Sequence, residues 1–134
     1  MSKIISRMFF MFLLFASVNS FSQDDPWNLV GETEKYKVYL NKDSIKNVGE
    51  TGSEFNIWLK LECITECNDG YKSISYSVQN WILYCGKNEF IVSKSIDHYT
   101  DGEENVFTMD TPTQVMENSP GEKVYNYFCT KQDK

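Results

Sequence analysis

Basic side chains, and arginine above all, are scarce in this chain. Arg7 is its single arginine, and residues 1–22 hold two of the 13 basic residues and none of the 19 acidic ones. The remaining chain, with 11 basic and 19 acidic residues, therefore carries a net charge of about −8. Binding of nucleic acid or anionic lipid relies on arginine and on a positive field, so neither is an expected partner. The acidity favours solubility.

Residues that carry catalysis are equally scarce. The single histidine, His98, follows Asp97 near the end of a predicted strand, and no serine lies in a nucleophile motif. We therefore interpret His98 as an ordinary strand-end residue and expect no enzyme activity and no cofactor. Four acidic residues resemble a calcium loop in composition only, because Tyr99 occupies the position of an oxygen ligand. They are Asp97, Asp101, Glu103 and Glu104.

The chain has one strongly apolar run, Met8–Val18. At about eleven residues it is shorter than the roughly 20 that a membrane-spanning helix needs. Lys3 and Arg7 precede the run, and Ser20–Ser22 supplies small residues at the positions that a signal peptidase reads. Residues 1–22 are therefore predicted to be a cleaved signal peptide.

Residues 23–134 are predicted to form a single domain, since 112 residues support one modest core. No cysteine lies near the predicted cleavage site, the first being Cys63, so a lipid attachment has no acceptor there. We expect an exported protein that is periplasmic, secreted or displayed on the cell surface, with no membrane span.

Four cysteines in a short exported chain predict disulfides, because the compartment outside the inner membrane is oxidising. Three pairings are open to four cysteines. We predict Cys63–Cys67, four residues apart in a turn-rich stretch, and Cys85–Cys129, which closes a loop of 44 residues. A loop of that length stabilises the fold by about 4 kcal/mol in the chain-entropy model. A four-thiolate zinc site is the weaker alternative, since one cysteine pair alone is closely spaced.

Alternation of apolar and polar residues predicts an antiparallel sheet. Two short runs, Trp27–Val30 and Tyr36–Leu40, are separated by polar residues and are typical of a hairpin. From Ser53 the alternation is clear, and the residues expected on one buried face are Phe55, Ile57, Leu59, Leu61 and Cys63. Trp58 lies on the other face, where packing against the sheet is its more common fate.

The next strands are predicted at Ser73–Cys85 and Glu89–Tyr99, after turn signals at residues 68–70 and 86–88. The serines at 73, 75 and 77 are expected to face water, and Trp81–Tyr84 is expected to be covered on both faces. The segments between these elements are less regular. We predict a turn or short helical turn beginning at Asp43, a weak strand or loop at residues 105–109, and irregular structure over residues 110–118.

The last element has helical signals. Ser119 and Glu122 are spaced as a capping box, with Pro120 at the first helical position. One helical face would then carry Val124, Tyr125, Phe128 and Cys129. Gly121 and the β-preferring residues here keep a final strand as the alternative. The predicted fold class is α+β: a mainly antiparallel sheet with a C-terminal helix packed on it and disulfides joining the two.

Several of these features together resemble a known family of bacterial exported proteins, the surface-adhesin protein E-like family, over about residues 27–130. The shared features are Trp27 and Val30, Val38–Leu40 followed by Lys42–Ile45, the strand around Trp58, the strand ending in Tyr84–Cys85, and Ser119–Gly121 followed by an apolar stretch ending in Phe128–Cys129. The resemblance implies one antiparallel sheet backed by a helix, with the central and C-terminal cysteines joined. It also implies a role in adhesion to host or matrix proteins.

We therefore predict an exported binding module whose partner is a host or envelope protein. Aromatic residues make up 15% of the chain, and alternation leaves some of Trp58, Tyr76 and Tyr99 off the main core face. Such side chains are typical anchors of protein contacts, although a second copy of the chain, in a homodimer, would also cover them. The alternative is a structural or stress-related envelope protein, or an inhibitor of secreted enzymes.

Overall fold

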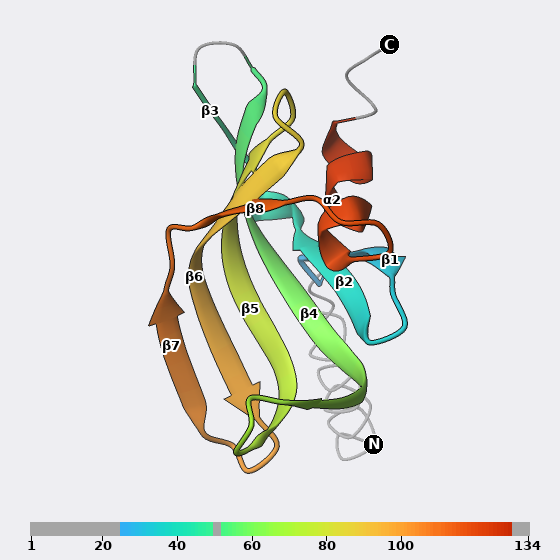
Figure 1. Cartoon of the computed structure of the whole chain (residues 1–134), viewed down its shortest axis with the longest axis vertical. Coiled ribbons are helices and arrows are strands. Elements are labelled where there is room, and N and C mark those ends of the chain that lie inside the picture. Colours follow the sequence, from blue (N-terminus) through green and yellow to red (C-terminus); the bar gives the residue numbers. More distant parts are fainter. Residues whose placement is uncertain (1–24, 50–51, 130–134) are drawn as a thin grey trace, which may run out of the picture.

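The computed structural model describes residues 25–49 and 52–129, so the predicted signal peptide lies outside the described residues. One antiparallel sheet carries a helix on one of its faces (Figure 1). The elements are β1 (Trp27–Glu32), β2 (Tyr36–Asn41), the 3-10 helix η2 (Lys42–Ser44), β3 (Lys46–Val48), β4 (Glu54–Asn68), β5 (Ser73–Tyr84), β6 (Glu89–Tyr99), β7 (Glu104–Thr108), β8 (Pro112–Gln114) and the α-helix α2 (Pro120–Phe128). The predicted α+β class is confirmed.

The long strands follow one another across the sheet in the order β1-β2-β4-β5-β6-β7, each antiparallel to its neighbours. Two short strands extend this order. β3 pairs with residues 54–56 of β4 and β2 pairs with residues 59–63, so β2 and β3 follow each other along one side of β4. In the same way β8 and β7 share one side of β6.

The core lies between the sheet and α2, which packs on β1 and β2 (Figure 1). Alternation along β4 buries every second side chain from Phe55 to Leu61, as predicted, whereas Cys63, predicted on the same buried face, is half-buried. The neighbouring strands add their buried side chains on the same face. The buried sheet residues are Val38, Leu40, Phe55, Ile57, Leu59, Leu61, Trp81, Leu83 and Phe90. From α2 come Val124 and Phe128, whose ring centroid is 5.1 Å from that of Phe55. We call this side of the sheet the helix face.

The last element is a helix, so the alternative of a final strand is wrong. The Ser119 hydroxyl oxygen accepts a hydrogen bond from the Glu122 backbone N–H at 3.3 Å, and Pro120 begins the helix. Gly121 is needed for close packing, since a Cβ there would lie 2.8 Å from the ring of Phe90. The capping signals therefore outweigh the β-preferring side chains.

The two disulfides join the pairs that the spacing predicts. Cys85–Cys129 links the end of β5 to the C-cap of α2, and the Tyr125 hydroxyl on the same helix donates to the Cys85 carbonyl oxygen. Cys63–Cys67 lies within β4. The first bridge fastens the helix to the sheet, whereas the second closes an irregularity inside one strand.

Several local predictions are wrong because strand pairing overrides turn signals. The stretch from Cys63 to Asn68 belongs to β4, with a register shift between Glu62 and Cys67 where a turn was predicted. Residues 110–118, predicted to be irregular, contain β8. The weak strand or loop predicted at residues 105–109 is a strand, β7, and that prediction is confirmed. The predicted helical turn is η2, although its cap is Asn41 and not Asp43, whose N–H donates to the Asn41 side chain at 3.0 Å.

Candidate binding surface

The sheet face opposite α2, which we call the outer face, has no α-helix against it in the described part of the chain. Register pairs place Trp58, Lys60 and Tyr76 on this face, and all three are half-buried. The prediction that Trp81–Tyr84 is covered on both faces is only partly met: Trp81 and Leu83 are buried on the helix face, whereas Ile82 and Tyr84 are half-buried on the outer face. Side chains there are shielded by their neighbours in the sheet.

A row of interacting side chains crosses the outer face from β2 to β7, and we call it the aromatic row: Tyr39, Lys60, Tyr76, His98 and Glu104. The Lys60 ammonium nitrogen lies 5.6 Å from the ring centroid of Tyr39 and 4.9 Å from that of Tyr76. The Tyr76 and His98 rings are stacked, with centroids 4.2 Å apart and an angle of 14° between planes. His98 Nδ1 lies 3.2 Å from Glu104 Oε1. Each side chain of the row thus interacts with the next one along it.

This arrangement suits recognition of another molecule. Rings that are already packed lose little side-chain entropy when a partner covers them, and tyrosine combines apolar area with a polar hydroxyl. A lysine between two rings adds cation–π attraction and a positive charge to the row. The aromatic row therefore offers anchoring groups in a fixed geometry.

The predicted surface aromatics divide between two environments. Trp58 and Tyr76 lie on the outer face, as alternation suggests. Tyr99 does not serve as a surface anchor, because it is 7% exposed and its hydroxyl donates to Asp69 Oδ2 at 2.7 Å. The membership of Tyr39, Lys60 and Glu104 in the row was missed from the sequence, since they belong to three different strands and only the register brings them together.

His98 and Asp97 are neighbours in sequence, but they lie on opposite faces of the sheet. His98 is in the aromatic row, whereas Asp97 pairs with Ser77 on the helix face. Alternation along a strand makes this separation unavoidable. The two side chains therefore do not form a catalytic pair.

Two of the four acidic residues that resemble a calcium loop, Asp101 and Glu103, have a common partner in the turn region. The Lys72 ammonium bonds Asp101, at 3.1 Å, and Glu103. These contacts raise the pKa of Lys72, the Glu103 hydrogen bond most strongly, and the Glu103 backbone N–H together with Lys72 lowers the pKa of Asp101. Among residues 25–49 and 52–129, no group of three or more histidine, cysteine, aspartate or glutamate residues is placed to hold a metal ion.

A polar network lies on the helix face over β5 and β6, away from the strands that α2 covers. Ser77 and Ser95, which are 9% and 5% exposed, both donate to Asp97 Oδ1, and Gln79 donates to Ser95. The prediction that Ser77 faces water is wrong. Its register opposite Leu61 places it on the side that carries the core.

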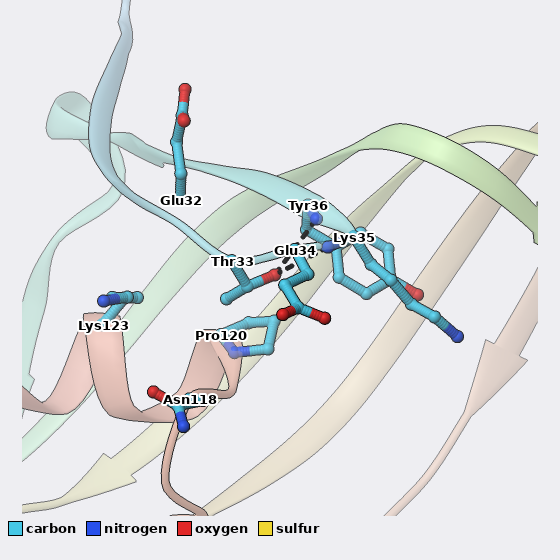
Figure 2. A pocket seen from close by; sticks show the side chains of 8 residues that line it. All are labelled: Glu32, Thr33, Glu34, Lys35, Tyr36, Asn118, Pro120 and Lys123. Atoms are coloured by element: carbon cyan, nitrogen blue, oxygen red, sulfur yellow. Dashed lines mark hydrogen bonds between the residues drawn. The ribbon is translucent and has the colours of Figure 1, made fainter.

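A groove of about 630 Å³ lies between the β1–β2 turn and the start of α2 (Figure 2). It is lined by Glu32, Thr33, Glu34, Lys35, Tyr36, Asn118, Pro120 and Lys123. The Thr33 hydroxyl oxygen accepts from the backbone N–H groups of Lys35 and Tyr36 at 3.3 and 3.1 Å, which shapes the turn. The charged side chains that line the groove point in different directions in Figure 2, so they do not converge on one position within it.

The described residues form a small disulfide-linked domain in which one α-helix covers one face of a sheet and the aromatic row crosses the other face. The chain belongs to the Surface-adhesin protein E family, whose model matches residues 27–130. Within the described residues, no helix has the length and apolar character to cross a membrane.

Two solved structures share the fold. Both are of Haemophilus influenzae protein E. Crystal form II is matched with a TM-score of 0.56 at 9% sequence identity, over 84% of this chain and 98% of that one. The other is matched with a TM-score of 0.55 at 8% identity, over 82% and 88%. A comparison with curated protein sequences finds no match.

Proposed function

We propose that this protein is an exported binding module that attaches to a host or extracellular-matrix protein through its outer face. The observation that carries the proposal is the aromatic row, in which Lys60 lies against the rings of Tyr39 and Tyr76 on a face without a covering α-helix in the described chain. Membership of a surface-adhesin family supports it. The aromatic content and the missing catalytic motifs of the sequence support it as well.

Tyr76 is the residue on which binding should depend most. Its ring stacks on His98 and lies beneath Lys60, so it occupies the middle of the row. Central aromatic side chains surrounded by other contacts are the usual hot spots of protein interfaces. We expect the partner to cover the Tyr76 ring edge and hydroxyl, with Tyr39 and Trp58 contributing at the periphery.

Export is part of the proposal. We propose that residues 1–22 are removed as a signal peptide and that residues 23–134 form the released domain. Two disulfides in a chain of this size support an oxidising location. A position on the cell surface would give the outer face access to host proteins, whereas a periplasmic position would limit its partners to envelope proteins.

The test is capture of partners from extracellular-matrix and envelope extracts by the purified protein, followed by affinity measurement with Tyr76→Ala. We expect this change to weaken binding by about 1 to 2 kcal/mol. The matched control is Tyr71→Ala, since Tyr71 is 98% exposed in the turn before β5 and lies outside the row. Equal effects of the two changes would contradict the role of the row. Retention of no partner from either extract would favour a structural role in the envelope.

A further inference from the structure

The polar network on the helix face has a direction. The Trp81 Nε1–H donates to Gln79 Oε1 at 2.8 Å, and the Gln79 side-chain N–H donates to the Ser95 hydroxyl oxygen at 3.2 Å. Ser95 in turn donates to Asp97 Oδ1 at 3.2 Å, and Ser77 donates to the same oxygen at 2.6 Å. In each of these four hydrogen bonds the acceptor lies toward Asp97. The network therefore ends in a negative charge that is held in place.

Asp97 has no positive partner within the described residues. The ion pairs there join Lys72 to Asp101 and Glu103 and His98 to Glu104. The two hydroxyl groups both bond Oδ1, which leaves Oδ2 as the acceptor for a further donor. Because the carboxylate is half-buried, a cation that reached it would interact more strongly than at a fully exposed site.

The surroundings of Asp97 suit a long basic side chain. Asn105 on β7 lies opposite Asp97, and Phe107 lies opposite Ser95, so both share the helix face with the carboxylate. Phe107 is 39% exposed. Its ring supplies apolar surface for the aliphatic stem of a lysine or arginine, while the Asn105 side chain adds a polar rim.

We propose that Asp97 is a receptor for a lysine or arginine side chain of a partner protein. The cationic head pairs with Asp97 Oδ2, the stem lies along Phe107, and the serine hydroxyls hold the carboxylate in place. The net charge of about −8 expected for the exported chain steers basic partners toward the domain. This site is on the opposite face from the aromatic row, so the two proposals fail independently.

The test is an NMR titration of the purified protein with acetyl-Gly-Arg-Gly-amide, and in parallel with the same peptide carrying citrulline, which is neutral and nearly isosteric. We expect the arginine peptide to shift the amide signals of residues 77, 95, 97 and 105, and the citrulline peptide to leave them in place. Asp97→Asn should weaken binding about tenfold, as expected for loss of a charge-assisted hydrogen bond in a partly buried site.

Asp110→Asn is the matched control, because it removes the same charge from an exposed position. It should leave the affinity unchanged. Equal weakening by both changes, equal binding of the citrulline peptide, or shifts confined to other residues would overturn the proposal. If Asp97→Asn does not fold, the comparison of the arginine and citrulline peptides on the unaltered protein still tests the proposal. If the arginine peptide binds at Asp97 but the extracts yield no partner, the proposed function is contradicted and the Asp97 proposal is not.

Discussion

Asp69 shows how one exposed side chain organises a corner of the molecule. Its Oδ1 accepts hydrogen bonds from the backbone N–H groups of Tyr71 and Lys72, both at 2.9 Å, and its Oδ2 accepts one from the Tyr99 hydroxyl. These bonds, that from Lys72 first, lower the pKa of Asp69 from 3.8 to about 2. The ionised carboxylate thus fixes the β4–β5 turn to the end of β6.

This pKa predicts a pH dependence. A carboxyl group whose pKa is lower in the folded than in the unfolded state contributes stability above pH 3.8, and loses that contribution as the pH falls toward about 2. Asp69→Asn should therefore reduce the dependence of the melting temperature on pH in this window. Thermal unfolding followed by circular dichroism between pH 5 and pH 2, expressed as the slope of melting temperature against pH, measures it.

The control for this prediction is Asp110→Asn, an exposed carboxyl group outside the turn. It should retain the slope of the unaltered protein. If Asp69→Asn also retains that slope, the hydrogen bonds of Asp69 do not contribute to acid stability as described.

At the scale of elements, the position of α2 depends on a few long-range links. Phe128 and Val124 pack on the sheet, Tyr125 donates to the Cys85 carbonyl oxygen, and Cys129 is covalently joined to Cys85. A helix of nine residues is too short to be stable by itself in water. Its stability therefore comes from the sheet that it covers.

The two disulfides should differ in their contribution to stability. The Cys85–Cys129 bridge spans 44 residues and the Cys63–Cys67 bridge spans four. In the chain-entropy model these loops correspond to about 4 and about 2 kcal/mol. Replacing both cysteines of the long bridge with alanine should therefore lower the free energy of unfolding by about 2 kcal/mol more than replacing both of the short bridge. Denaturant unfolding under non-reducing conditions measures the difference.

Each double variant serves as the control for the other, because each retains one bridge. Equal losses would show that the long bridge restricts the unfolded chain no more than the short one. A Cys63–Cys85 peptide in a non-reducing digest would show that the pairing itself is wrong.

For the molecule as a whole, the two faces of the sheet differ in how deeply their side chains are buried. The helix face holds the core around Leu40 and Leu59, both 0% exposed, while the outer face holds half-buried side chains that pack on one another. The stability of the molecule should therefore depend on the core residues of the helix face more than on the outer face, which carries the aromatic row. The Asp97 site also lies on the helix face, but Asp97 is not one of the core residues.

A matched pair of leucine substitutions tests this division. Leu59→Ala removes a fully buried side chain and should lower the free energy of unfolding by about 3 kcal/mol. Leu29→Ala, on the outer face of β1 opposite Tyr39 and 53% exposed, should lower it by less than about 1 kcal/mol. Denaturant unfolding of both variants gives the comparison. Similar losses would mean that the outer face contributes to the core as much as the helix face does.

The sequence by itself determined the long strands and the buried face of β4, and it favoured the C-terminal helix over a strand and the two observed disulfides over the other pairings open to four cysteines. These features depend on local signals: alternation from Phe55 to Leu61, the Ser119 cap with Pro120, and the spacing of the cysteines. A hydrophobic period or a capping residue acts within a few residues of its own position. Such signals can therefore be identified without knowing which strands are neighbours.

The tertiary structure alone decided which side chains meet across the sheet. β3 and β8 exist because β4 and β6 each extend beyond their long neighbours and leave an edge to be paired. Register places Ser77 opposite Asp97, so a serine that sequence alternation groups with Ser73 and Ser75, and that was expected to face water, is buried in a hydrogen-bonded network. It also aligns residues from five strands in the aromatic row. Cross-strand contacts join residues distant in the chain, and their register depends on the packing of the whole core.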